Sequence, residues 1–213
     1  MSPTVLVRED VSELAPLVRR AVDLDPAALA RVRRAGSHVS LLVRLPFGVL
    51  AARTVEAAGP GVDVDTTVRG SELLAWLDGA QDEPPQARDA QWRGGSPPTS
   101  GWRRVDRVPD ADIRPLVRSG ALTLKQAAER EGVPGAQPRE AVADALLDSI
   151  VLTVSGDGLT VEISLRTLSA LTRMGFLPRD SHAAIDVAGR WVRVAAAYGS
   201  VYAERPGAGL TVR

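Results

Sequence analysis

The sequence predicts an α+β fold in which a Pro/Gly-rich linker joins two small domains of mixed helices and strands. Strand-like and helix-like segments alternate on both sides of the linker. Between them, runs such as Glu83-Pro84-Pro85 and Gly94-Gly95-Ser96-Pro97-Pro98 interrupt every periodic pattern. The chain has 213 residues, of which 45% are hydrophobic and 24% charged, and this composition is typical of a globular protein. The predicted boundaries are 1–80 for the first domain, 81–110 for the linker and 111–213 for the second domain.

The first domain is predicted to contain three helices and four strands. Asp25 before Pro26, with Gly36 at the other end, provides start and stop signals for a helix between them. Two apolar, β-branched runs around Pro46-Phe47-Gly48 predict a hairpin. The predicted helices are Glu13–Val22, Ala27–Ala35 and Glu72–Asp78, the last capped by Ser71; the predicted strands are Thr4–Arg8, Val39–Leu45, Val49–Val55 and Val62–Val68.

The second domain is predicted to open with three helices and to continue with a hairpin, a helix and a sheet. The pair Asp157-Gly158 favours a tight turn between two strands. The predicted helices are Ile113–Arg118, a segment from Thr123 to Gly132, Pro138–Ser149 and Leu165–Met174; the predicted strands are Ile150–Val154, Leu159–Ile163, Ala184–Val187, Arg190–Ala196, Ser200–Ala203 and Leu210–Val212.

Three helices followed by a hairpin over residues 112–163 resemble the winged-helix family, in which one helix enters the DNA major groove. The resemblance implies nucleic-acid binding, with Lys125, Arg130 and Arg139 as contacts. Acidic side chains on the predicted third helix oppose that role, because they would approach phosphates. In composition, with Lys125 as its only lysine, the chain also resembles uncharacterised conserved proteins of high-GC bacteria. No motif carries this second resemblance, so it implies no activity.

Several classes of chemistry lack the residues that they need. The chain has no cysteine, which excludes disulfides, thiol nucleophiles and cysteine-ligated metals, and we expect a cytoplasmic location. The two histidines, His38 and His182, lie far apart in sequence and in no catalytic motif. Basic and acidic residues number 26 each, so no excess charge favours a polyanion. We therefore expect no cofactor and no catalysis, with an enzyme that uses carboxylates alone as an alternative.

The candidate contact residues are aromatic and arginine side chains, which are enriched where proteins bind one another. Two tryptophans lie beside arginines in the predicted linker, and three aromatic residues lie in the last predicted sheet. An unbroken strand would place Tyr198 and Tyr202 on one face and Trp191 on the other. We expect a regulatory or accessory protein that binds another protein or a second copy of itself. The proposed contacts are Trp92, Trp102, Arg103, Arg104, Trp191, Tyr198 and Tyr202.

Overall fold

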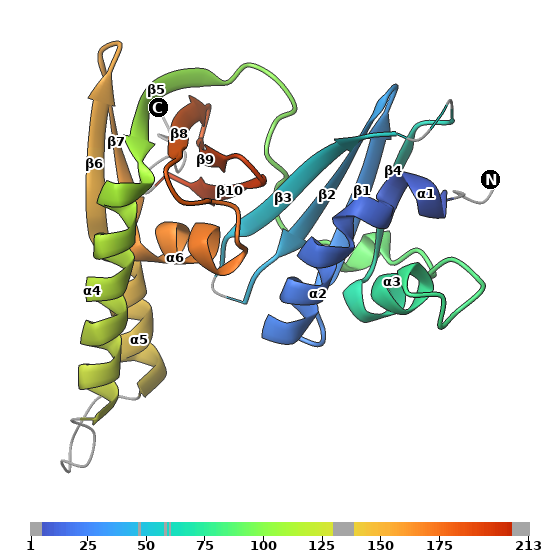
Figure 1. Cartoon of the computed structure of the whole chain (residues 1–213), viewed down its shortest axis with the longest axis horizontal. Coiled ribbons are helices and arrows are strands. Elements are labelled where there is room, and N and C mark those ends of the chain that lie inside the picture. The colour runs from blue at the N-terminus through green and yellow to red at the C-terminus, as the bar shows by residue number, and fades with distance from the viewer. Residues whose placement is uncertain (1–5, 47, 58, 60, 130–138, 206–213) are drawn as a thin grey trace, which may run out of the picture. The chain divides into compact units, whose positions relative to one another are not determined.

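The computed structural model describes residues 6–46, 48–57, 59, 61–129 and 139–205. The chain divides into two compact units, Met1–Ser96 and Pro97–Arg213 (Figure 1). Each unit combines an antiparallel sheet with helices, which confirms the predicted α+β class and the presence of two domains. Within the described residues, no helix is both long enough and apolar enough to cross a membrane.

The first unit is a four-stranded antiparallel sheet in the order β4-β1-β2-β3. Helices lie on one face of this sheet (Figure 1), where Ala30, Val32, Leu41 and Val43 are buried together with Leu17 of α2. Burial of these apolar side chains stabilises the unit. The elements are α1 (Arg8–Val11), η1 (Ser12–Leu14), α2 (Ala15–Leu24), β1 (Leu29–Ala35), β2 (His38–Arg44), β3 (Leu50–Glu56), β4 (Val64–Arg69), α3 (Gly70–Leu77) and η2 (Asp89–Gln91).

The predicted helix Ala27–Ala35 is wrong, because this segment forms strand β1. Alternate residues of β1, Ala30, Val32 and Arg34, are buried, which is the period of a strand with one inward face. The Asp25 carboxylate accepts a hydrogen bond from Ala27 N at 2.8 Å, and the Asp25 carbonyl accepts one from Ala28 N at 2.9 Å. Asp25 therefore closes a local turn before the strand and does not cap a helix.

The remaining elements of the first unit follow the predictions with shifted ends. The predicted hairpin is confirmed as β2 and β3, and the predicted helices Glu13–Val22 and Glu72–Asp78 correspond to α2 and α3. Ser71 does not cap α3, which begins one residue earlier at Gly70. Of the predicted strand Thr4–Arg8, residues 4 and 5 lie outside the described residues and Arg8 begins α1 instead.

The second unit contains a four-stranded antiparallel sheet in the order β10-β9-β8-β5 and the separate hairpin β6-β7. Helix α6 contacts β9 and β10, and α4 lies beside α5 (Figure 1). The elements are β5 (Arg103–Pro109), α4 (Asp110–Glu129), α5 (Arg139–Asp148), β6 (Ile150–Gly156), β7 (Leu159–Ser164), α6 (Leu165–Arg173), β8 (His182–Ala188), β9 (Trp191–Ala196) and β10 (Gly199–Glu204). The predicted strand Leu210–Val212 lies outside the described residues.

The predicted three-helix opening of this unit is wrong. One continuous helix of 20 residues, α4, replaces the first two predicted helices, and it contains both Pro115 and Gly120. Gly120 lies inside the helix, where α4 meets α6. A Cβ atom at this position would collide with the buried side chain of Leu165, so the glycine allows close packing of the two helices. Among the residues described before the hairpin in this unit there are two helices, and the structure does not support the winged-helix resemblance.

The predicted linker 81–110 contains regular structure at both ends. Residues 103–109 form strand β5, which pairs with β8, so this part is not a linker. Earlier in the segment, Arg88 N donates to Thr67 O at 2.6 Å, and the Asp89 carboxylate accepts from Thr67 N at 2.5 Å. These hydrogen bonds hold η2 against strand β4 of the first unit. The Pro and Gly residues between η2 and β5 do not prevent these hydrogen bonds, because they lie outside the bonded segments.

Candidate functional site

One row of side chains crosses all four strands of the sheet in the second unit. The strand register places Arg104 of β5 opposite Asp186 of β8, Asp186 opposite Arg193 of β9, and Arg193 opposite Tyr202 of β10. Residues directly opposite one another in antiparallel strands point to the same side of a sheet. Together with Trp102 and Trp191, this row forms what we call the Asp186 face: Trp102, Arg104, Asp186, Trp191, Arg193 and Tyr202.

Asp186 is the buried centre of this face. Its side chain is only 2% exposed and accepts hydrogen bonds from the Nε atoms of Arg104 and Arg193, the latter at 2.9 Å. Arg193 Nη2 lies 2.8 Å from the same carboxylate oxygen. A buried carboxylate is tolerated when cations and hydrogen bonds compensate it, and two guanidinium groups do so here. Both arginines are held in defined positions while part of each remains exposed, 43% for Arg104 and 25% for Arg193.

Trp102 packs over the exposed side of this ionic centre. The guanidinium carbon of Arg193 lies 4.5 Å from the centre of the Trp102 ring, which is a cation–π distance. The Trp102 and Tyr202 rings lie 5.5 Å apart, tilted by 55°. Trp102 Nε1 also donates to the carbonyl of Pro98 at 3.0 Å. The ring is therefore fixed by three contacts, and the face combines rigid aromatic surface with partly exposed positive charge.

Four of the predicted contact residues, Trp102, Arg104, Trp191 and Tyr202, meet on this face. The predicted separation of Trp191 from Tyr202 is wrong: the chain turns back between β9 and β10, and the register pairs Trp191 with Glu204, two residues from Tyr202 and on the same side. Trp191 is itself buried, with Arg190 over its ring at 5.7 Å. Sequence reasoning missed Asp186 and Arg193 as members of the site.

The other predicted contacts lie elsewhere. Tyr198 is 54% exposed in the turn between β9 and β10, and Arg103 is exposed opposite Val187. Trp92 belongs to the first unit, where its ring contacts the guanidinium groups of both Arg31 and Arg44. Lys125 is exposed on α4 and lies 3.8 Å from the carboxylate of Glu129. Arg139 begins α5, and Arg130 lies outside the described residues.

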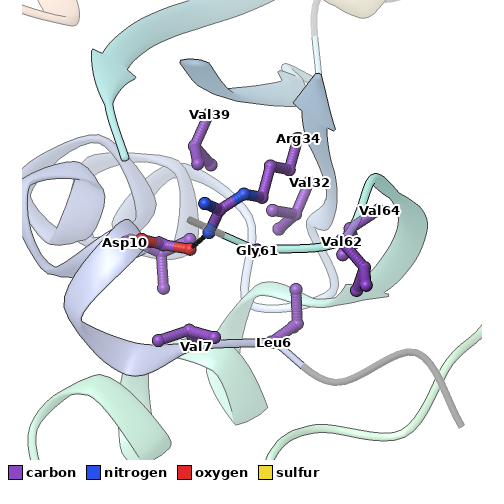
Figure 2. Close-up of a pocket in the computed structure, with 10 residues that line it drawn as sticks. Leu6, Val7, Asp10, Val32, Arg34, Val39, Gly61, Val62 and Val64 are labelled. Atoms are coloured by element: carbon purple, nitrogen blue, oxygen red, sulfur yellow. Dashed lines mark hydrogen bonds and ion pairs between the residues drawn. The ribbon is translucent and has the colours of Figure 1, made fainter. Parts of the chain in front are cut away.

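A cavity of about 190 Å³ lies in the first unit beside α1 and strands β1, β2 and β4. Figure 2 shows Arg34 crossing this cavity toward Asp10, with valine side chains around the pair. Arg34 and Asp10 form a buried ion pair in which each side chain is 5% exposed, and Arg34 also donates to the carbonyl of Gly59. This volume is below the range of about 300–1,000 Å³ that is usual for small-molecule sites. The ion pair connects α1 to β1, which is a structural role.

The residues that the structure describes contain no group of three or more His, Asp or Glu side chains placed to hold a metal ion. His38 begins β2 in the first unit and His182 begins β8 in the second. The Asp186 face itself presents cations, aromatic rings and hydrogen-bond donors, which are groups that bind other molecules.

The architecture is similar to that of bacterial DNA polymerase sliding clamps. The β subunit of DNA polymerase III from Pseudomonas aeruginosa aligns with a TM-score of 0.56 and 11% identity over 95% of this chain and 64% of that one. The sliding clamp of Caulobacter crescentus aligns with a TM-score of 0.56 and 12% identity over 97% of this chain and 66% of that one. The β clamp of Helicobacter pylori aligns with a TM-score of 0.55 and 8% identity over 94% of this chain and 64% of that one. The chain spans less than two thirds of the length of each clamp. At these identities the likeness shows the fold.

In sequence, residues 97–208 match the family described as Domain of unknown function (DUF8185), and this match covers just over half of the chain. The chain therefore belongs to the DUF8185 family. Residues 3–94 match a second family, described as Domain of unknown function (DUF8010). No curated protein matches the chain.

Proposed function

We propose that this protein works without catalysis, as an accessory protein that binds another protein through the Asp186 face. The observation that carries the proposal is the row from Arg104 to Tyr202, in which a buried carboxylate holds two arginines beside two aromatic rings. Tryptophan, tyrosine and arginine are the residue types that contribute most to binding energy at protein interfaces. Four of the six residues on this face are of those types and lie on β5, β9 and β10, and a fifth, Trp102, packs over them.

The way in which these side chains are held favours binding. Immobilising a flexible side chain on association costs about 0.5–1.5 kcal/mol, so side chains that are already fixed bind at a lower entropic cost. Asp186 fixes both Arg104 and Arg193, while Arg193, Tyr202 and the Pro98 carbonyl together fix Trp102. Each arginine keeps donors that Asp186 does not use. A partner that presents a carboxylate or backbone carbonyls beside an apolar side chain would satisfy those donors and cover the rings.

The fold supports an accessory role. The similar structures are described as sliding clamps and as the β subunit of DNA polymerase III, which is one part of a larger polymerase. Fold similarity alone does not transfer function, because one fold supports many sites. Here the fold similarity agrees with a second, independent observation, which is that the Asp186 face has the residue composition of a protein interface.

Nucleic-acid binding through the same face is the second candidate. Aromatic rings beside arginines form stacking platforms for single-stranded nucleic acids, and the Trp102–Tyr202 pair next to Arg193 has this composition. Against it stands the charge balance of the whole chain, 26 basic and 26 acidic residues. The two candidates respond differently to salt, since phosphate contacts release counterions and weaken steeply as salt rises.

Affinity capture from native extract with the full chain tests the proposal. We expect a partner to be retained by the wild type and by Tyr198→Ala, and to be lost with Tyr202→Ala. Tyr198 is the matched control because it is an exposed tyrosine of the same unit away from the Asp186 face. Retention should persist after nuclease treatment and should fall less steeply with rising salt than binding through phosphates would. If all three proteins capture the same partners, or if capture requires intact nucleic acid, the protein-binding function is contradicted.

A further inference from the structure

A hollow of about 380 Å³ lies beside Trp92 in the first unit. It is lined by Arg44 and residues 91–93, together with residues 25, 27–29, 45, 46 and 48. This volume falls within the usual range for small-molecule sites, about 300–1,000 Å³. The hollow is separate from the Asp186 face, whose residues all belong to the second unit.

The two guanidinium groups that flank the Trp92 ring differ in how their charge is compensated. Arg31 forms two hydrogen bonds to Asp65, Nε to Oδ1 at 2.6 Å and Nη2 to Oδ2 at 2.9 Å. Arg44 lies 5.5 Å from the ring centre, and no carboxylate of the described residues lies within 4 Å of it. Its Nη2 donates only to a backbone carbonyl, that of Arg93, at 2.8 Å. No carboxylate of the described residues therefore compensates the charge of Arg44, which is partly exposed at the wall of the hollow.

The indole N–H of Trp92 also lacks a partner. Within the part of the chain that the structure describes, Trp92 Nε1 is buried and has no hydrogen-bond acceptor. The protein encloses this atom, so the N–H senses the hollow only through the indole ring. Arg93, an exposed residue, lines the same hollow. The wall thus carries two arginine residues beside the indole ring.

We propose that this hollow binds the oxyanion group, a carboxylate or a phosphate, of a small molecule. An oxyanion supplies the negative charge that Arg44 lacks, and charge-assisted hydrogen bonds to arginine are among the strongest in proteins. Asp25 is the acidic residue on the rim, and its Oδ1 is already hydrogen-bonded to Ala27 N. The Trp92 ring provides a flat surface for the rest of the ligand.

The test is a ¹H–¹⁵N NMR titration of the full chain that follows the indole N–H signals with inorganic phosphate and, separately, with acetate. Trp92→Phe identifies the Trp92 signal by its loss and keeps an aromatic ring in place. We expect that signal to shift to saturation with at least one anion. Arg44→Gln should weaken binding about tenfold or more, as expected when a charged hydrogen-bond partner is removed.

Arg53→Gln is the matched control, because Arg53 belongs to the same sheet and lies 3.9 Å from Glu13, away from the hollow. Its titration should equal that of the wild type, which also shows that lowering net charge by one is not the cause. A stronger response to phosphate assigns a phosphate ligand, and a stronger response to acetate assigns a carboxylate. The proposal is overturned if neither anion gives a saturable shift, if sodium chloride at equal ionic strength gives the same shift, or if Arg44→Gln binds as the wild type does.

Discussion

Asp186 of β8 and Arg193 of β9 face each other across the strand pair, with 2.8 Å between Asp186 Oδ2 and Arg193 Nη2. The same carboxylate also receives Arg104 from the other side. Because the Asp186 side chain is only 2% exposed, water cannot take the place of an arginine that is removed from its carboxylate. The Asp186–Arg193 pair therefore links the stability of the sheet to the arrangement of the Asp186 face.

Asp186→Ala should lower the free energy of unfolding of the second unit by about 1–3 kcal/mol, because it removes charge-assisted hydrogen bonds to two partly exposed guanidinium groups. Urea unfolding followed by circular dichroism measures this. Glu162→Ala, which removes an exposed carboxylate from β7, should change the same quantity by less than about 0.5 kcal/mol. Equal losses for the two variants would show that Asp186 has no special role.

The buried pair Asp10–Arg34 should respond differently to single and double substitution. Asp10→Ala alone should destabilise the first unit by about 3–5 kcal/mol, since Arg34 would remain charged among valines. Replacing both partners with apolar residues of similar size, Asp10→Leu with Arg34→Met, should recover most of that loss, because no charge is then buried. Thermal and urea unfolding of the single and double variants provide the comparison. A double variant as unstable as the single one would contradict the ionic explanation.

Asp65 provides a pH-dependent contribution to stability. The hydrogen bond from Arg31 lowers the pKa of Asp65 below its ordinary value near 3.9. A carboxyl group whose pKa is lowered on folding stabilises the fold above its unfolded pKa, and that contribution is lost as pH falls through the folded value. Asp65 is half-exposed, so the contribution at neutral pH should not exceed about 1 kcal/mol.

Asp65→Asn should therefore be less stable than the wild type at pH 7, and the gap should close as the pH falls below about 4. Urea unfolding of both proteins at pH 7, 5 and 3 measures the gap. A gap that stays constant or widens at low pH would mean that the Arg31–Asp65 hydrogen bond is not its source.

Gly156 should be intolerant of a side chain. It ends β6, and a Cβ atom there would collide with the backbone carbonyl oxygen of Val105 in β5, at the point where the pairing of β5 with β8 shifts register. Backbone atoms move less easily than side chains, so Gly156→Ala should cost about 1–3 kcal/mol. Gly59→Ala, where a Cβ meets nothing within 4 Å, should be nearly neutral. The thermal unfolding midpoints of Gly156→Ala and Gly59→Ala measure this difference. Similar midpoints would show that β6 does not approach β5 this closely.

Local signals predicted the hairpins and the helix ends well. The Asp157-Gly158 turn has positive φ at both residues, 50° and 73°, as the tight turn requires, and Gly79 and Gly175 follow α3 and α6 in the left-handed region. Where the prediction was wrong, a distant partner decided the structure. In β1 the inward position 34 is occupied by an arginine whose charge the distant Asp10 compensates, so the apolar alternation of a strand is not visible in the sequence. Gly120 resembles a helix end and instead makes room for Leu165.

The Asp186 face could be predicted only in part for the same reason. Residue type identified Trp102, Arg104, Trp191 and Tyr202, since these aromatic and arginine side chains suit interfaces. Their meeting depends on the register of four strands, which no local pattern encodes. Asp186 and Arg193 were not predicted as contact residues, because a charged residue in an apolar strand has no assignable role until its partners across the sheet are known. The short turn at Gly189-Arg190, which brings Arg193 back beside Asp186, is the signal that was available.

Photo-crosslinking tests protein binding through the Asp186 face most directly. Ser200 of β10 lies on that side of the sheet, two residues before Tyr202, so p-benzoylphenylalanine at Ser200 would reach a bound partner without removing any residue of the face. We predict that this probe crosslinks a distinct protein in native extract, that the same probe at Tyr198 does not, and that adding Tyr202→Ala abolishes the crosslink. Crosslinking at Ser200 no stronger than at Tyr198, or unaffected by Tyr202→Ala, would contradict the proposed function.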